Sequence, residues 1–377
     1  MRDKNMENFY TSIEPLCTFL RFLGFLPRNF INPACKGQLK KTRFSIIQTG
    51  FGVGLLLLLS IGNMVHYFVY EVYKMDLLIY SIWSWILFFA NLSFTIECIY
   101  QLYKADSITT FFKLMQTIDL KILQMEVSID HRVHRKIVSN VILITVLLMF
   151  ARIPLIVIFY GYVFEFYTRQ VLISEVFYNF LLIYECLFCL QFIIPTYLLR
   201  ERFKLLKDIL RFIFLERKTF NLNLFTEIFH DLSDALDTIN SLFTSHLFPT
   251  ILLMLLIDIF GIYGVTKFSF TTAKFTDIFL SLFYIIVHFI LKIMICHIGY
   301  STTNEAENIK ITFVKGMNKI NLSSEESSLV FVYNQIEARD LRLQNIFFVV
   351  DWKMLFGTTY TIVTFLVITC QFQSPLR

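Results

Sequence analysis

A stripe of residues on the last apolar segment of the chain has the composition and spacing needed to conduct ions. Five positions within residues 354–372 recur at intervals of four, three, four and three: Gly357, Thr361, Thr364, Ile368 and Gln371. On a helix of about 100° per residue these positions share one face, with Phe372 at its edge. An unpaired amide in hydrocarbon costs several kcal/mol, so this stripe has to face protein or water. One copy of the helix cannot enclose water, but several copies around an axis can.

The composition indicates that this segment belongs to a membrane protein. Of the 377 residues, 56% are hydrophobic and 17% are charged. No soluble domain requires so much apolar surface, and we therefore expect an all-α polytopic membrane protein. The net charge of +5 could indicate nucleic-acid binding. However, the positive charges are concentrated in alternate loops, which is typical of a membrane protein with a defined topology. We therefore expect no nucleic-acid partner.

Hydrophobic runs predict seven transmembrane helices. Each run is close to or longer than the roughly 20 residues that a bilayer requires. The predicted spans are 44–68, 76–100, 137–164, 171–199, 246–266, 277–300 and 347–372.

The distribution of Lys and Arg predicts the orientation of these spans. The N-terminal tail, the six successive loops and the C-terminal tail carry 8, 1, 6, 1, 7, 2, 5 and 1 of them. Because cytoplasmic segments are enriched in positive residues, the N-terminus is predicted to be cytoplasmic and the C-terminus extracellular. This topology is the inverse of that of a G-protein-coupled receptor.

The predicted inner segments are long and amphipathic, and they suggest four parts of the chain. Residues 1–43 form a cytoplasmic tail with an interfacial helix around 13–26, and residues 44–300 form a six-helix bundle that binds ligand. Helix extensions at 200–245 and an anchor loop and helix at 301–346 carry apolar stripes. These stripes either fold on one another within one chain or join subunits in a cytoplasmic anchor. Residues 347–377 are the pore helix and a short extracellular tail.

Ligand binding is expected in the predicted outer half of the first six helices. The candidates are aromatic or polar residues at that depth: Tyr67, Trp83, Trp85, Arg152, Tyr160, Tyr178, Asp258, Tyr263, Tyr284 and His288. Arg152 and Asp258 lie about 22 Å and about 18 Å from the cytoplasmic ends of their helices at about 1.5 Å per residue. Intramembrane charges pair or line a pathway, so the two form either a polar floor to the pocket or a purely structural ion pair.

Other motifs carry little chemistry. Cys186 and Cys189 form a CxxC within an apolar span and are interpreted as packing residues. His131 and His134 lie beside Arg132, Arg135 and Lys136, and we expect a solvated basic turn facing the membrane surface. We find no nucleophile with a base, no metal ligand set and no nucleotide motif. The sequence therefore predicts neither an enzyme nor a cofactor.

The C-terminal residues resemble a known signature. Residues 364–372, TFLVITCQF, are similar to the ending of insect gustatory receptors, which is Thr-Tyr, five apolar residues and then Gln-Phe. Phe365 stands where Tyr is usual. Leu366 stands where the sugar-sensing branch typically has Glu, which argues against a sugar receptor.

The resemblance implies a ligand-gated, non-selective cation channel of four subunits, each lining the pore with its last helix. Carried onto this chain, Gln371 and Phe372 form the extracellular constriction, Ile368 lies one turn deeper, and Thr361 and Thr364 line the same face. Alternatively, Gln371 hydrogen-bonds a neighbouring helix. The expected partners are a small tastant of the bitter or other non-sugar kind, membrane lipid, permeating monovalent and divalent cations, and identical or related subunits. The expected location is the plasma membrane of a sensory neuron dendrite.

Three other functions compete with this one. An odorant receptor subunit that needs a co-receptor shares the architecture, but the Gln-Phe ending favours the gustatory side. A seven-helix receptor that signals through a soluble partner requires an extracellular N-terminus, which conflicts with the charge alternation. A secondary transporter should show an internal repeat, and we see none.

Overall fold

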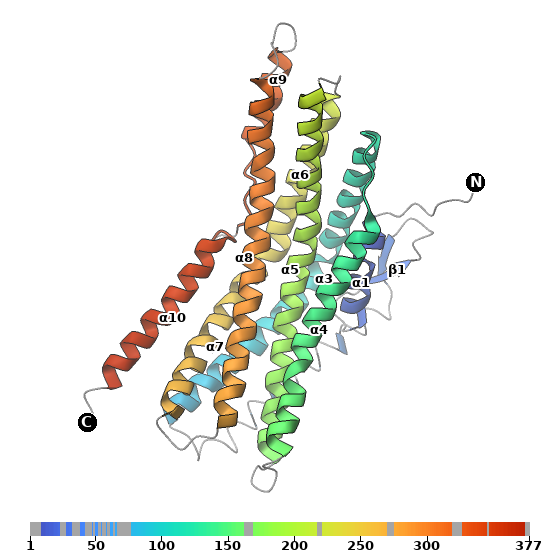
Figure 1. The fold of residues 1–377 in the computed structure, drawn as a ribbon. Coiled ribbons are helices and arrows are strands. Elements are labelled where there is room, and N and C mark those ends of the chain that lie inside the picture. Colours follow the sequence, from blue (N-terminus) through green and yellow to red (C-terminus); the bar gives the residue numbers. More distant parts are fainter. Residues whose placement is uncertain are drawn as a thin grey trace.

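A computed structural model of the chain is mostly helical (Figure 1). The structure describes residues 9–22, 28–31, 38–41, eight positions between 47 and 65, and residues 77–161, 169–216, 221–269, 275–318, 326–344 and 347–373.

The helices are α1 (Phe9–Phe22), α3 (Leu77–Gln124), α4 (His131–Gly161), α5 (Arg169–Glu216), α6 (Leu222–Ile239), α7 (Ser245–Ser269), α8 (Phe275–Met317), α9 (Glu326–Glu337) and α10 (Trp352–Gln373). A π-helical segment, η2 (Asn240–Thr244), joins α6 to α7. An antiparallel hairpin of β1 (Arg28–Ile31) and β2 (Gln38–Lys41) is a small addition to the expected all-α fold.

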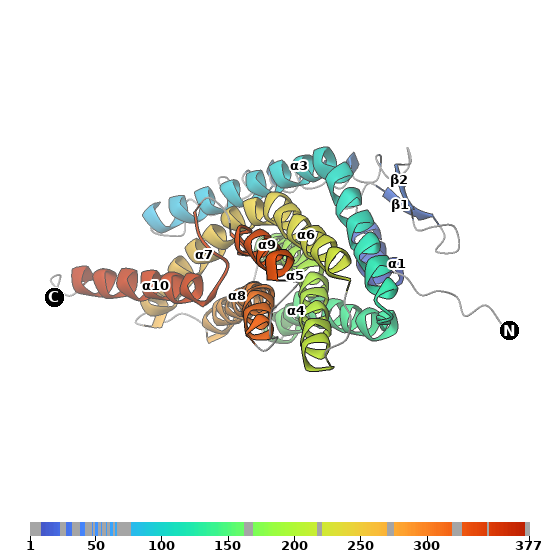
Figure 2. The ribbon, with the colours of Figure 1, turned by 90° about the horizontal axis from the view of Figure 1, so that it is seen from above.

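The long helix α5 lies at the centre of the bundle. Seen from above, α3, α4, α6, α7 and α8 are arranged around it (Figure 2). Its 48 residues span about 72 Å at about 1.5 Å per residue, whereas the hydrocarbon layer is about 30 Å thick. Helix α5 therefore extends well beyond any membrane it crosses. Apolar residues such as Leu187, Phe192 and Leu198 bury its length in the core.

Several of the helices are apolar enough to cross a membrane. Within the described part of the chain, His131–Phe150, Leu182–Leu215 and Leu282–Met317 meet this criterion by length and composition. The bent pair of Leu222–Phe243 and Leu247–Tyr263 would be a fourth span, and Trp352–Ile368 is a shorter apolar helix. The polytopic helical class is supported, while the count of seven spans and the inverted topology stay predictions. Most of the predicted first span, 44–68, lies outside the described residues.

The last helix begins later than predicted. Helix α10 starts at Trp352 rather than at residue 347. Asp351 ends the preceding loop because its Oδ1 accepts hydrogen bonds from the N–H groups of Lys353 and Met354, at 2.8 and 3.2 Å. This side-chain cap satisfies two of the free N–H groups of the first turn and sets the start of the helix.

Helix α1 is part of the bundle. It covers Phe9–Phe22 instead of the expected 13–26, and it packs against α4 and α3. Phe9, Ile13 and Leu16 are buried. This helix therefore lies in the protein core, whereas an interfacial helix was expected.

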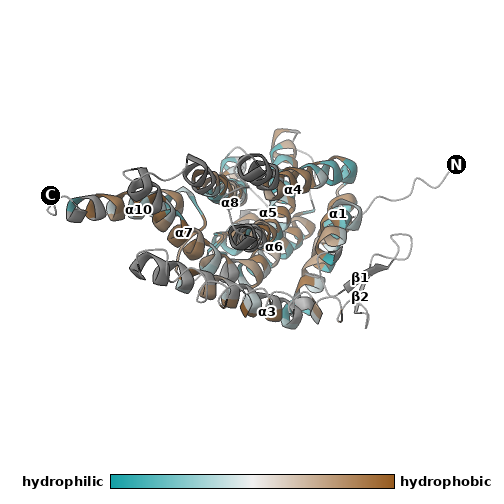
Figure 3. Cartoon of the chain, turned by 90° about the horizontal axis from the view of Figure 1, so that it is seen from below, coloured by the Kyte–Doolittle hydropathy of each residue, from teal (hydrophilic) through white to brown (hydrophobic). Residues whose placement is uncertain are grey.

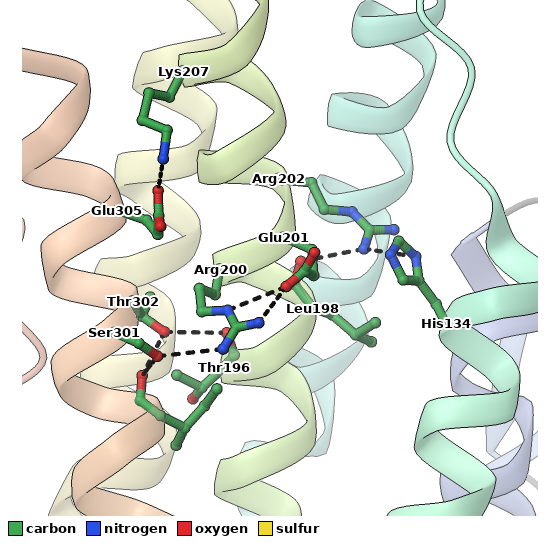
Figure 4. Close-up of polar contacts among 11 residues, drawn as sticks. His134, Thr196, Leu198, Arg200, Glu201, Arg202, Lys207, Ser301, Thr302 and Glu305 are labelled. Atoms are coloured by element: carbon green, nitrogen blue, oxygen red, sulfur yellow. Dashed lines mark hydrogen bonds and ion pairs between the residues drawn. The ribbon is translucent and has the colours of Figure 1, made fainter. Parts of the chain in front are cut away.

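The predicted apolar stripes of the helix extensions fold on one another within the chain. Buried residues from α5, α6, α8 and α9 meet there: Phe203, Leu206, Leu210, Phe225, Ile228, Phe229, Leu232, Ile309, Phe313, Leu329, Val332 and Ile336. Polar contacts join α5 to α8 along the same stretch, from Lys207 to Glu305 and from Arg200 to Ser301 (Figure 4). Folding within one chain, which was one of the two alternatives for these stripes, therefore accounts for their buried faces.

A buried ion pair ties α5 to α3. The Arg202 Nε and Nη2 atoms each lie 3.0 Å from one carboxylate oxygen of Asp119, and the Arg202 side chain is 1% exposed. Arg202 Nη1 also reaches His134 Nδ1 on α4, at 3.4 Å (Figure 4). Because Arg202 contacts both α3 and α4 from α5, one side chain holds three helices together.

The expectation for the two histidines was wrong. His131 is buried, with Nδ1 3.0 Å from Ser12 Oγ on α1 and Nε2 3.7 Å from Asp119 Oδ2, and His134 is half-buried. The spacing explains the difference. Positions three apart share a helix face, so both histidines face α1, α3 and α5. The neighbouring basic residues, Arg132 among them, are exposed.

We predict that Arg202→Met lowers the free energy of unfolding by about 3–5 kcal/mol, because it leaves the Asp119 carboxylate buried without its cation. The matched control is Arg211→Met on the same helix, where the side chain is exposed. The measurement is the thermal unfolding midpoint of the purified protein in detergent. Equal midpoints for the two variants would contradict the role of this ion pair.

Candidate functional site

Four ionisable side chains meet inside the bundle where α5, α7 and α8 pack together. His288 Nε2 lies 2.8 Å from Glu185 Oε2, and His288 Nδ1 lies 2.9 Å from Asp258 Oδ1. Lys292 Nζ contacts the other Asp258 oxygen, Oδ2. We call Glu185, Asp258, His288 and Lys292 the charge cluster. It links α5 to the consecutive helices α7 and α8.

The charge cluster is removed from solvent. The side chains of Glu185 and His288 are 0% exposed, and those of Asp258 and Lys292 are also buried. An uncompensated charge in such a place costs several kcal/mol, so the opposite charges have to remain paired. A carboxylate only accepts hydrogen bonds, so His288 carries a proton on both ring nitrogens if Glu185 and Asp258 are both ionised. The negative charges of Glu185 and Asp258 are then balanced by the positive charges of His288 and Lys292.

One polar atom of the charge cluster remains unsatisfied. Within the described residues, Glu185 Oε1 is buried and has no hydrogen-bond partner. Buried polar groups are nearly always paired with protein, water or ligand. Within the described residues, this oxygen is therefore the atom of the charge cluster that still lacks a donor.

The charge cluster lies deep between the helix ends. His288 is 13 residues from the start of α8, or about 20 Å, and Asp258 is 11 residues before the end of α7, or about 16 Å. The end of α7 and the start of α8 lie at the same end of the bundle (Figure 1). The charges are thus in the interior of the apolar bundle.

Of the predicted pocket residues, three come together. Tyr284 packs edge-on against His288, with ring centroids 5.8 Å apart, and His288 contacts Asp258. Both Asp258 oxygens contact other groups, namely His288 and Lys292. Arg152 is on α4, but its side chain lies outside the described residues, so its pairing with Asp258 stays a prediction.

The other pocket candidates are not brought to the charge cluster by any described contact. Trp85 on α3 is 58% exposed and stacks on Phe89, and Tyr263 on α7 is half-buried. Tyr67 lies outside the described residues, as do the side chains of Trp83, Tyr160 and Tyr178. Their predicted roles therefore stay predictions.

Sequence reasoning missed two members of the charge cluster, Glu185 and Lys292. Each is a charged residue within a long apolar stretch, which is by itself a reason to expect function in a membrane protein. The residues predicted from the sequence were instead aromatic residues, His288 and the pair of Arg152 and Asp258. The adjacent Cys186 lies in the hydrophobic core with Cys189, as the apolar sequence indicated.

Helix α10 leans away from the rest of the bundle in both views (Figures 1 and 2). Among the predicted pore residues, Thr361 and Gln371 are exposed, Ile368 is 45% exposed and Thr364 is half-buried. Nothing lies within 4 Å of the position that a Gly357 Cβ would occupy. The predicted stripe therefore faces away from its own bundle. The side chain of Phe372 lies outside the described residues.

A second strip on α10, next to the first, is apolar and exposed. It consists of Phe356, Tyr360, Val363 and Val367, of which Tyr360 is 73% exposed. On the opposite side, Met354 and Leu355 are buried and Phe365 contacts Phe260 of α7, with ring centroids 6.0 Å apart. Apolar residues dominate α7 and much of α10 (Figure 3). One chain thus covers only a narrow side of this helix.

Three hydroxyl groups of α10 donate hydrogen bonds within the helix. Thr361 Oγ1 donates to the Gly357 carbonyl at 2.9 Å, and Thr358 and Thr359 donate to the Leu355 carbonyl. Such bonds let a helix carry hydroxyls through hydrocarbon without unpaired donors. Helix α10 is therefore compatible with both lipid and a partly polar lumen.

The sequence profile of a family described as 7tm chemosensory receptor matches residues 13–374. The chain belongs to the 7tm chemosensory receptor family. The match covers nearly the whole chain, so every described helix except the first turn of α1 falls within it. No curated protein sequence matches the chain significantly.

Two solved structures share the fold. The insect olfactory receptor OR5 from Machilis hrabei aligns over 94% of this chain and 97% of its own, with a TM-score of 0.65 and 14% sequence identity. The same receptor in complex with eugenol aligns over 95% of this chain and 97% of its own, with a TM-score of 0.64 and 11% identity. At these identities the likeness establishes the architecture alone.

A pair of double-mutant cycles tests which cation pairs with Asp258. We predict a coupling free energy of about 1–3 kcal/mol between Asp258→Asn and Lys292→Met, because contacting charges are non-additive. The same cycle with Arg152→Met measures whether Arg152 also pairs with Asp258, as the sequence predicts. Thermal unfolding in detergent provides the measurement. A larger coupling for Arg152 than for Lys292 would contradict the observed pairing.

Proposed function

We propose that this chemosensory receptor is a subunit of a ligand-gated, non-selective cation channel that detects tastants other than sugars. The observation that carries the proposal is the exposed stripe on α10. Thr361, Ile368 and Gln371 are exposed on the side of α10 that is turned away from its own bundle. Several copies of α10 around an axis would give this stripe a common lumen.

The adjacent apolar strip supports assembly into a tetramer. Large exposed apolar residues such as Phe356 and Tyr360 next to a polar stripe suit a helix surface that is covered by another subunit or by lipid. In a ring, the polar stripe faces the axis while the apolar strip packs on the neighbouring helix or on lipid. The tetramer contains identical or related chains and resides in the plasma membrane of a sensory dendrite.

Physical chemistry suggests how this pore would work. Rings of Ile368 and Phe372 side chains form a hydrophobic constriction that excludes water when closed. After the ring widens, the Gln371 amides replace part of the hydration shell of a passing ion. The stripe contributes no acidic ring, so we expect weak discrimination among monovalent cations and passage of divalent ones.

Ligands are proposed to bind in the outer half of the bundle, above the charge cluster. The related OR5 structure with eugenol contains a small aromatic molecule. The aromatic candidates in this chain, Tyr284 among them, would suit ligands of similar size. The charge cluster would then form the polar floor of that pocket, with Asp258 in the role expected from the sequence.

The assignment to taste rests on residues 364–372, which resemble the gustatory signature, and Leu366 favours a non-sugar ligand such as a bitter plant compound. An odorant receptor subunit that requires a co-receptor is the second candidate. The olfactory function of the structurally similar OR5 favours this alternative.

Whole-cell recording from cells that express this chain alone tests the proposal. We expect Phe372→Ala to raise ligand-independent current several-fold and Gln371→Ala to shift the reversal potential in mixed cations, because both residues line the constriction. The matched control is Val363→Ala, which is exposed on the apolar strip of the same helix.

Currents unaltered by both pore substitutions would contradict the assignment of α10 to the pore. Current that appears only when an odorant co-receptor is co-expressed would favour the second candidate.

A further inference from the structure

The loop that leads into α10 is short and ordered by its own hydrogen bonds. We call residues 340–344 and 347–351 the α10 linker. The Val350 N–H donates to the Leu343 carbonyl at 2.8 Å, and Gln344 forms an isolated antiparallel bridge with Val349. Leu343 and Val350 are fully buried. The Asp340 carboxylate accepts bonds from the Arg342 side chain, which lower its pKa.

The side chain of Asn240 holds this linker from one side. Asn240 is the first residue of η2, at the junction of α6 and α7. Its Nδ2 donates to the Arg342 carbonyl at 2.9 Å, and its Oδ1 accepts from the Gln344 N–H at 3.0 Å. Only a side-chain amide offers a donor and an acceptor in this arrangement. Asn240 thus pairs with the linker backbone as a neighbouring strand would.

Helix α8 holds the linker from the other side. A Cβ atom at Gly299 would lie 2.4 Å from the Val350 carbonyl oxygen and 2.7 Å from Val350 Cγ1. Any larger residue there would push the linker away from α8. One turn further along α8, Thr303 Oγ1 accepts a hydrogen bond from the Leu343 N–H at 3.3 Å. The linker is therefore fixed to the α6–α7 junction and to α8 together.

We propose that Asn240 and Gly299 are positioning residues for gating, because they clamp the α10 linker so that a movement of α7 relative to α8 is delivered to the base of α10. This inference rests on the proposed channel function. Helix α10 packs on α7 and α8, with contacts that include Phe365 and its first turn, and the linker joins the base of the helix to the rest of the chain.

The charge cluster connects the clamp to ligand binding. Asp258 lies on α7, and its partners His288 and Lys292 lie on α8, so the cluster sets how these two helices sit against each other. Lys292 is seven residues from Gly299, or two helical turns of about 10 Å in total. A ligand that alters the charge cluster changes how α7 and α8 sit against each other near His288. Asn240 and Gly299 then transmit this change to the α10 linker.

Two measurements on the full-length channel test the clamp. The first is hydrogen exchange of the purified protein, read at the Leu343 and Gln344 amides. The second is whole-cell current with and without two probes, eugenol and quinine. The variants are Asn240→Ala, which loses both hydrogen bonds to the linker, Asn240→Asp, which keeps the acceptor, and Gly299→Ala. The control is Ser241→Ala, whose hydroxyl donates to the Thr238 carbonyl away from the linker.

We expect Asn240→Ala and Gly299→Ala to speed linker exchange at least tenfold and to raise the half-activating probe concentration at least tenfold. Asn240→Asp should lie between Asn240→Ala and the wild type, and Ser241→Ala should match the wild type. Unchanged exchange in Asn240→Ala would overturn the clamp even if Gly299→Ala fails to fold. Faster exchange with unchanged activation would overturn its role in gating.

The exchange measurement separates this inference from the proposed function. A wild-type chain that conducts under no condition would count against the channel itself, and the gating role would fall with it. The exchange rates at Leu343 and Gln344 would still decide whether Asn240 and Gly299 clamp the linker.

Discussion

Pairing of buried charge is the constraint on which the rest of the structure depends. Helix α5 carries two such sites, Glu185 in the charge cluster and Arg202 seventeen residues further on, about 26 Å away. The first ties α5 to α7 and α8, and the second ties it to α3 and α4. Because an unpaired charge in an apolar interior costs several kcal/mol, these contacts exclude alternative registers that apolar packing alone would tolerate.

Helix α10 contributes no residue to these two charge sites. This separation is consistent with the gating role proposed for α10. The two ion-pair sites fix α3, α4, α5, α7 and α8 relative to one another, whereas neither of them holds α10. The fully buried Leu343 and Val350 and the exposed Tyr360 illustrate the contrast. The proposed ligand binding and the proposed ion passage would then involve different elements, connected through α7, α8 and the linker.

Much of the architecture could be predicted from the sequence because it follows from local patterns. Apolar runs predicted the long helices, and a spacing of three and four predicted the stripe on α10. Long-range pairing could not be predicted in this way. Nothing local distinguishes Arg202 from the exposed Arg211, and Asn240 and Gly299 become significant only when the α10 linker packs against them. His131 was misjudged because its basic neighbours lie on the other face of the same helix.

Cysteine accessibility along α10 tests the central claim most directly. Single cysteines would be placed on the polar stripe at Gly357, Thr361 and Thr364 and on the apolar strip at Phe356, Tyr360 and Val363, with Cys370 replaced by serine. Current would then be recorded while a charged thiol reagent is applied from outside during channel opening. The account predicts block at the stripe positions and little effect at the strip positions. Block confined to the strip, or no block at any position, would contradict it.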